Sequence, residues 1–359
     1  MIYLDYQATT PLAPGALAAM LPWLETQHAN PHAPHRAGRA AKAAVEVARD
    51  AIAAQLPPGG SLRFTSGATE SLNWAIKGTR GGIVTLASEH AAVLDTVAAE
   101  AARGRAVTVL PVGRDGLIDL AVAAAAIRPG VGLVAAMLVN NEIGVIQPIA
   151  ALAELAHAAG ALMLCDAVQG FGRVAMPPGC DLIALSAHKM HGPKGIGALW
   201  VRDGVEPEPL LHGGGQERGR SGTLSPALCA GFGAAAALLG AEGERDAAHV
   251  ERLWQLAVDA LPGWRINGTA APRYRGNLNV GRDGLDVARL MSECRDLACS
   301  AGSACASGSG RSSHVLRAIG LSEGEARSSL RLGFGRYTDE AELRAGLALI
   351  VAAAARQGL

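Results

Sequence analysis

Two lysines, Lys189 and Lys194, lie within six residues of each other, although only four of the 32 basic residues of the chain are lysines. An arginine stays protonated in a protein, whereas a lysine amine that is desolvated near other cations can lose its proton and form an imine. Both lysines belong to the segment SAHKMHGPKG (186–195), which follows the apolar run DLIALS (181–186). Because Lys189 follows that run more directly, we predict that Lys189 is the reactive amine and that Lys194 is structural or faces the substrate.

An acidic residue ends another apolar run. The run ALMLCD (161–166) ends at Asp166, and Gln169 follows three residues later. Ligands of open α/β sheets bind at the carboxyl ends of the strands. Asp166 could therefore keep a ring nitrogen of a ligand protonated, and Gln169 could reach the same ligand. The alternative is that Asp166 only caps a helix.

The segment FTSGATESLNWAIKG (64–78) is small and glycine-bearing before it becomes helical. Such a helix N-terminus offers free backbone N–H groups and hydroxyls, which suit a phosphate, and here they would come from Ser66, Gly67, Ala68 and Thr69. The alternative is an ordinary capping box. No nucleotide P-loop and no G-x-G-x-x-G follows a strand. A lysine and an acid at strand ends, with a phosphate cradle, together suit pyridoxal phosphate.

Cys305 stands alone in the Gly/Ser-rich stretch SAGSACASGSGRSS (300–313), which its composition predicts to be a flexible loop. A thiol that only packs would sit in an apolar segment, as Cys165 does. A thiol on an exposed loop suggests that its reactivity is used. An incidental cysteine in a linker is the alternative.

We predict no metal site. A cluster or zinc site at Cys294, Cys299 and Cys305 would have C-x4-C-x5-C spacing, without a C-x2-C pair or a clear fourth ligand. Three further candidates surround two prolines and are better explained as a polar loop: His28, His32 and His35.

The elements that would position these residues alternate between short apolar runs and Ala-rich helical stretches. The segment 148–160 has a proline at its start, a glycine at its end and apolar residues at helical spacing. This alternation predicts a largely parallel sheet. Beyond about residue 240 this alternation ends, and the strand candidates become shorter. We expect a large α/β domain over 14–243 and a smaller α+β domain, formed by 1–13 and 244–359, that carries the loop 300–313. The strand candidates are 81–88, 132–139, 161–166, 181–186, 197–201 and, in the smaller domain, 276–281.

Composition narrows the classes of partner. The 359 residues are 50% apolar and carry a formal net charge of zero, which gives no electrostatic reason to expect a nucleic acid or an anionic membrane. No secretory signal is visible at the N-terminus. The six cysteines are scattered through the chain, as expected for reduced thiols in a cytoplasm.

Taken in order, the motifs resemble those of the cysteine desulfurases, pyridoxal-phosphate enzymes of fold type I, in the subgroup with a long S-x-G-S-A-C loop. This resemblance implies a mainly parallel seven-stranded sheet in the large domain. The motif GQERGRSGT is shorter than the corresponding family motif, and Gly333 stands where Ser is common in the family. The motifs that carry it are YLDYQATTP, NPHAPHRAG, FTSGATESLNWAIKG, SEHAAVLD, NNEIGVIQP, DAVQ, SAHKMHGPKGIGALWVR, HGGGQERGRSGT, NLNV, SAGSACASG and RLGFGRYT.

The resemblance also implies roles for single residues. Lys189 would be the Schiff-base lysine and Cys305 the sulfur acceptor, and His90 would stack over the cofactor ring. Asp166 would pair with the pyridine nitrogen and Gln169 with the phenolic oxygen. The remaining positions would bind phosphate (Ala68, Thr69, Ser186, His188), the phosphate of the other subunit of a homodimer (Thr223), the substrate carboxylate (Arg331), and both cofactor and substrate (Asn141).

The expected activity is removal of sulfur from L-cysteine, which leaves L-alanine and a persulfide on Cys305. A sulfur-acceptor protein of iron–sulfur cluster, thio-cofactor or tRNA assembly would receive that sulfur. Alternatives of the same fold are a selenocysteine lyase and an aminotransferase. A more distant alternative is a non-enzymatic iron–sulfur or sulfur-carrier protein.

Overall fold

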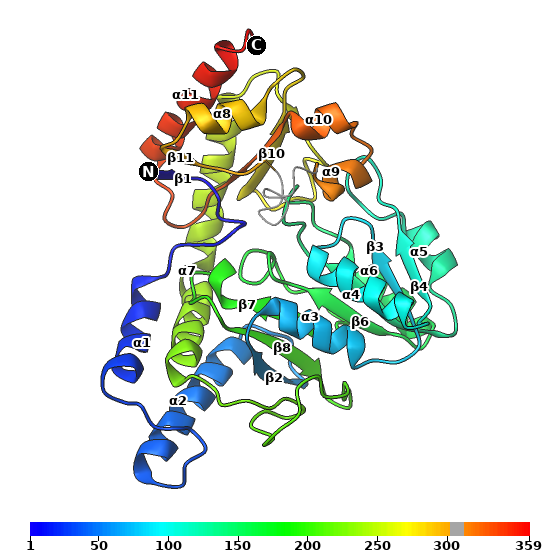
Figure 1. The fold of residues 1–359 in the computed structure, drawn as a ribbon, viewed down its shortest axis with the longest axis vertical. Helices are drawn as coiled ribbons and strands as arrows, with labels where there is room; N and C mark the ends of the chain where they lie inside the picture. Colours follow the sequence, from blue (N-terminus) through cyan, green and yellow to red (C-terminus); the bar gives the residue numbers. More distant parts are fainter. Residues whose placement is uncertain (302–311) are drawn as a thin grey trace.

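The computed structural model describes residues 1–301 and 312–359, and its centre is a seven-stranded sheet with the strand order β2-β8-β7-β6-β5-β3-β4 (Figure 1). The strands from β3 to β7 pair in parallel, whereas β8 is antiparallel to both of its neighbours. The mainly parallel seven-stranded sheet is thus confirmed. The strands are β2 (Gly60–Thr65), β3 (Gly82–Leu86), β4 (Val107–Leu110), β5 (Val131–Met137), β6 (Leu162–Asp166), β7 (Leu182–Ser186) and β8 (Gly197–Arg202).

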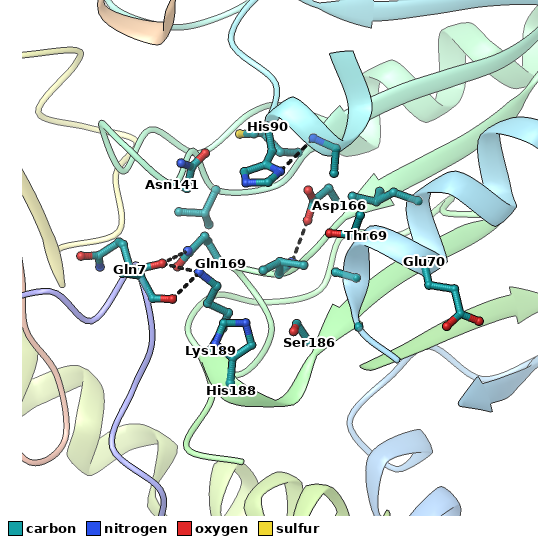
Figure 2. Close-up of a pocket in the computed structure, with 18 of the residues that line it drawn as sticks. Gln7, Thr69, Glu70, His90, Asn141, Asp166, Gln169, Ser186, His188 and Lys189 are labelled. Atoms are coloured by element: carbon teal, nitrogen blue, oxygen red, sulfur yellow. Dashed lines mark hydrogen bonds between the residues drawn. The ribbon is translucent and has the colours of Figure 1, made fainter. Parts of the chain in front are cut away.

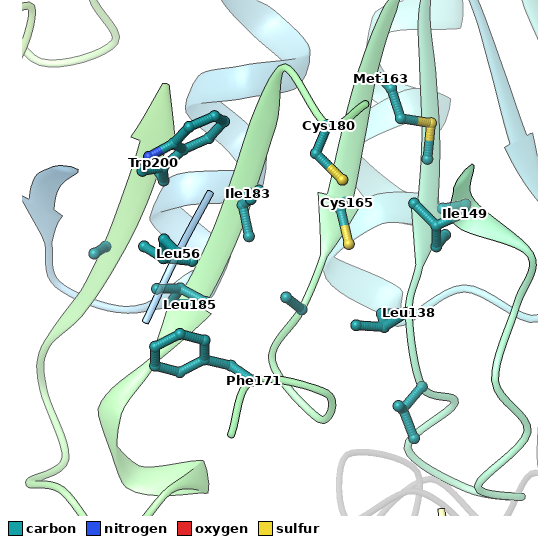
Figure 3. Packing of buried hydrophobic residues seen from close by; sticks show 14 of the residues in the cluster. Leu56, Leu138, Ile149, Met163, Cys165, Phe171, Cys180, Ile183, Leu185 and Trp200 are labelled. Atoms are coloured by element: carbon teal, nitrogen blue, oxygen red, sulfur yellow. The ribbon is translucent and has the colours of Figure 1, made fainter. Parts of the chain in front are cut away.

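The five apolar runs predicted as strands of this sheet are β3, β5, β6, β7 and β8, and they are nearly continuous in apolar residues because both faces of the sheet are covered. Figure 3 shows Met163, Cys165, Ile183 and Trp200 on adjacent strands packing into one layer. The covering helices are α1 (Pro14–Glu25), α2 (Arg36–Ala53), α3 (Ala68–Lys77), α4 (Ala91–Ala102), α5 (Leu120–Ala126) and α6 (Ile149–Ala158).

The helix predicted over 148–160 is α6. It ends before Gly160, which has a φ of 77°. A residue in this left-handed conformation stops a helix most easily when it is glycine, because no Cβ clashes with the backbone.

A second hydrophobic cluster is formed mainly by the chain ends. In it, β12-β10-β9 form an antiparallel sheet and β1 pairs in parallel with β11. The helices α9 and α10 instead pack on the hydrophobic cluster shown in Figure 3, which is the larger of the two. The elements are β1 (Ile2–Tyr3), β9 (Arg265–Ile266), β10 (Asn277–Gly281), α8 (Val287–Glu293), β11 (Leu297–Ala298), α9 (His314–Ala318), α10 (Glu323–Arg327), β12 (Ser329–Gly333) and α11 (Glu340–Ala355).

One long helix, α7 (Pro226–Asp259), joins the two clusters and runs vertically through the left half of Figure 1. Its first half contributes Phe232 to the larger cluster and its second half contributes Trp254 to the smaller one. By length and composition α7 could cross a membrane, but a core helix has the same properties, and both halves of α7 are packed in this way. The first half of α7 packs in the larger cluster and the second half in the smaller one. We therefore propose that the domains divide near residue 243, inside a continuous helix.

Candidate active site

A cavity of about 420 Å³ lies where the ends of β5, β6 and β7 meet the N-terminus of α3 (Figure 2). Residues far apart in the sequence converge there, because carboxyl ends of parallel strands share one sheet edge. The predicted site residues that line it are Ala68, Thr69, His90, Asn141, Asp166, Gln169, Ser186, His188, Lys189 and Arg331.

Lys189 ends a short 3-10 turn (Ala187–Lys189) that follows β7 directly. Its Nζ donates hydrogen bonds to the carbonyl oxygens of Gln7 at 2.5 Å and Ala8 at 2.9 Å. Burial, followed by the positive charges of Arg331 and Arg173, lowers the pKa of Lys189 from 10.5 to about 8. Near neutral pH this amine can therefore become the unprotonated nucleophile that an imine requires.

Asp166, the last residue of β6, lies at the buried side of the cavity. Its Oδ1 accepts a hydrogen bond from the Val168 N–H at 3.0 Å, and burial raises its pKa to about 6. A protonated ring nitrogen beside this carboxylate would favour the charged form of both groups. Asp166 does not cap a regular helix, since the residues after it form a turn.

His90 is the N-cap residue of α4, and its Nδ1 accepts a hydrogen bond from the Ala92 N–H at 3.0 Å. Burial, and then the charge of Lys189, lowers the pKa of His90. The neutral ring with an accepting Nδ1 carries its proton on Nε2. Figure 2 shows this ring on the opposite side of the cavity from His188 and Lys189, where it can cover a flat ligand.

The N-terminus of α3 is an open cradle. Gly67 is the N-cap and has no side chain to bond the first N–H groups of the helix, so those of Ala68 and Thr69 are available to an anion. Glu70 accepts a hydrogen bond from the Ser66 N–H at 2.7 Å, but the N-cap is Gly67, so the alternative of an ordinary capping box does not describe this helix start. Gly197 lies behind the cradle, and a Cβ there would come within 2.7 Å of Gly67.

Arg331, the residue predicted to bind the substrate carboxylate, lies on β12 and lines the cavity. The Arg331 side chain is 2% exposed, and it donates to Asp5 Oδ1 at 2.7 Å and to the Asn141 carbonyl oxygen at 3.1 Å. Within the described residues, Arg331 Nε and Asn141 Oδ1 are buried without a hydrogen-bond partner. Unpaired buried polar atoms are rare, and here they mark a site that a ligand would complete.

One predicted residue among those described lies elsewhere. Thr223 is exposed on the loop between β8 and α7, outside the cavity lining, although Arg220 of the same loop pairs with Glu70 at 2.9 Å. Cys305 lies outside the described residues. The main chain of Ser300, before it, exchanges two hydrogen bonds with Arg331 of the cavity. After it, the Ser313 hydroxyl donates to buried Glu142.

The described residues contain no group of three or more His, Cys, Asp or Glu side chains placed to hold a metal. Cys294 is buried, and its Sγ donates to the Leu349 carbonyl oxygen at 3.7 Å. His35 accepts the Gly38 N–H at 3.2 Å as the N-cap of α2.

Sequence reasoning missed the hydrogen bonds that hold several of the site residues in position. Gln7 and Ala8 hold the Lys189 amine through main-chain carbonyls, which no side-chain motif reports. Arg173 contacts Gln169 from outside the cavity. The signal for Gln7 was present in the motif YLDYQATTP, but its partners come from distant segments.

A protein-family model, named proteins and solved structures are all similar to this chain. The family model described as Aminotransferase class-V matches residues 2–345. A protein of Rickettsia bellii (strain OSU 85-389) named Cysteine desulfurase IscS is 44% identical, covering 97% of this chain and 90% of that protein. A solved NifS-like protein superposes with a TM-score of 0.90 at 30% identity over 99% of both chains. A structure described as SspA in complex with cysteine has a TM-score of 0.84 at 36% identity, covering 94% of this chain and 100% of that one.

Proposed function

The chain belongs to the aminotransferase class-V family, and we propose that it is a pyridoxal-phosphate-dependent cysteine desulfurase that removes the sulfur of L-cysteine and leaves L-alanine. Relatives that are 41–44% identical over 97% of the chain carry the name cysteine desulfurase. The observation that carries the proposal is the convergence of Lys189, Asp166 and the open N-terminus of α3 on one cavity.

The residues present fit pyridoxal phosphate. The α3 cradle, with Ser186 and His188, would hold its phosphate, and Asp166 would face its ring nitrogen. Gln169 would donate to its phenolic oxygen and His90 would cover the ring. Bound there, the cofactor supplies an aldehyde for the imine and an electron sink for the substrate Cα.

The side chains of this protein would do the remaining work. Arg331 would bind the substrate carboxylate, assisted by Asn141, and so orient the Cα–H bond. The Lys189 amine, with a pKa lowered to about 8, would take the Cα proton as a general base. Asp166 would keep the proton on the ring nitrogen.

The sulfur would pass to Cys305. A thiolate is the nucleophile, and burial raises the pKa values of Cys229 and Cys299 to about 12, which makes both poor acceptors. The Cys305 thiolate would form an S–S bond to the substrate sulfur as the substrate Cβ–S bond breaks, and the electron pair released to Cβ would be taken up by a proton as alanine forms. The resulting persulfide would deliver its outer sulfur to an acceptor protein. A homodimer, in which Thr223 reaches the phosphate of the other subunit, belongs to the same proposal, as does a cytoplasmic location.

The purified protein mixed with pyridoxal phosphate and L-cysteine tests this proposal. We expect visible absorbance from the bound cofactor, followed by stoichiometric alanine and sulfide in the presence of a reductant. A keto-acid product would instead identify an aminotransferase. Protein that stays colourless and releases no alanine would refute the proposal.

A further inference from the structure

Arg173 lies behind the wall of the active-site cavity, in the turn that follows β6. It lines a second, smaller cavity of about 50 Å³ rather than the active site itself. Its guanidinium lies 5.2 Å from the centre of the Tyr274 ring, in a cation–π contact. The guanidinium thus packs against Tyr274, which lines the second cavity and not the active site.

The other side of this guanidinium contacts two residues of the active site at once. Nη1 donates to Gln169 Oε1 at 2.5 Å, and Nη2 donates to the carbonyl oxygen of Lys189. The two contacts connect the residues expected at the phenolic oxygen and at the imine of the cofactor.

The contact with Arg173 fixes which way the Gln169 amide faces. Arginine can only donate hydrogen bonds, so it must meet the oxygen of the amide. On the other side, Gln169 Nε2 donates to the Gln7 carbonyl oxygen at 2.9 Å, and a carbonyl can only accept. Both neighbours therefore require one orientation, in which the second N–H of Nε2 remains as a donor to a ligand.

We propose that Arg173 is a positioning residue that orients the Gln169 amide and the Lys189 main chain toward the cofactor, an inference that rests on the proposed function. Without Arg173, only the Gln7 carbonyl oxygen would hold the amide in this orientation, and the hydrogen bond from Gln169 to the phenolic oxygen would weaken.

The charges around Lys189 set the direction of the expected effect. A hydrogen bond donated to the phenolic oxygen and a nearby guanidinium both disfavour an additional proton on the Lys189 nitrogen. Loss of Arg173 removes the guanidinium charge and weakens the hydrogen bond that Gln169 donates. The ionisable groups around this nitrogen are Arg331, Arg173, Asp5, Asp166, His90 and His188.

The test is the pH midpoint of the visible absorbance of the cofactor-loaded protein, measured without substrate. We expect Arg173→Met to raise this midpoint by about 0.5 to 1 pH unit. Arg173→Lys keeps the charge but cannot bridge two acceptors in the same way, so its shift should be smaller. In a Gln169→Ala background the effect of Arg173→Met should also be smaller, because one of its targets is gone.

Arg105→Met is the matched control. Arg105 is also largely buried and donates to the Gly81 carbonyl oxygen at 2.6 Å and to Thr79, but it lies outside the cavity lining. Its midpoint should equal that of the wild type. Wild-type midpoints in both Arg173 variants, an equal shift in Arg105→Met, or a fully additive effect with Gln169→Ala would each overturn the inference. If Arg173→Met fails to fold, Arg173→Lys alone decides by the presence or absence of a shift. A colourless wild-type protein would instead reject the proposed function itself.

Discussion

The Lys189 Nζ lies 2.5 Å from the carbonyl oxygen of Gln7, so the N-terminal segment holds the amine that follows β7. The same carbonyl also accepts the Gln169 amide at 2.9 Å. One main-chain oxygen therefore joins two cavity residues to a segment that lies 182 and 162 positions away from them in the chain. Both donors reach a carbonyl oxygen rather than a carboxylate, so neither hydrogen bond occupies Asp166, which remains available to a ligand.

Replacing Lys189 by alanine should abolish the stable visible absorbance of the bound cofactor, because no other cavity lysine is present among the described residues. Lys189→Arg should behave in the same way, since a guanidinium stays protonated and forms no imine. Lys194→Arg is the matched control and should retain the colour. A spectrum like that of the wild type in Lys189→Ala would disprove the assignment.

Capture of pyridoxal phosphate by the cofactor-free protein should depend on pH with a midpoint near 8. Below the lowered pKa of Lys189 the amine is protonated and unreactive, so the rate should rise about tenfold per pH unit and level off above it. Stopped-flow absorbance between about pH 6 and pH 10 measures this rate. A midpoint near the ordinary lysine pKa of 10.5 would show that burial and the two arginines do not act on this amine.

Arg331→Lys should raise the KM for cysteine by about 10- to 100-fold, with a smaller change in kcat. A lysine cannot reproduce a two-pronged contact with a carboxylate while also keeping the bond to Asp5. The cofactor spectrum without substrate should stay close to that of the wild type, which separates substrate binding from cofactor binding. Exposed Arg344, replaced by lysine, serves as the control. An unchanged KM would exclude Arg331 as the carboxylate ligand.

Cys305→Ala should bind the cofactor normally but form no alanine from cysteine. Cys299→Ala removes a buried thiol and should keep desulfurase activity. Alanine release and protein-bound persulfide, detected by mass spectrometry of the intact protein, distinguish the two variants. Full turnover by Cys305→Ala would eliminate the persulfide step.

Most of the cavity lining could be predicted because its chemistry is local in sequence. Asp166, Ser186 and Lys189 each lie at or just after a strand end, and parallel strands bring such ends together whatever the details of the fold. The order of the strands was not readable, because a short apolar run fits several places in a sheet.

The contacts that hold the site residues in position could not be predicted from the sequence. The bonds from Lys189 to Gln7 and from Arg331 to Asp5 join segments 182 and 326 residues apart, and nothing in either local pattern encodes its partner. The first half of α7, which begins at Pro226, was not predicted as a helix, because its several glycines weaken the helical signal.

The loop that carries Thr223 should depend for its position on Glu217. This carboxylate is 4% exposed and accepts the Phe64 N–H at 2.8 Å and two hydrogen bonds from Arg49. Glu217→Ala leaves the buried Phe64 N–H without an acceptor and removes the buried carboxylate that accepts two hydrogen bonds from Arg49, so we expect a loss of about 3 kcal/mol in the free energy of unfolding. Glu46 pairs with the same arginine but is 49% exposed, and Glu46→Ala should cost at most about 0.5 kcal/mol. Denaturant midpoints of the two cofactor-free variants measure the difference, and equal midpoints would mean that Glu217 does not anchor the loop.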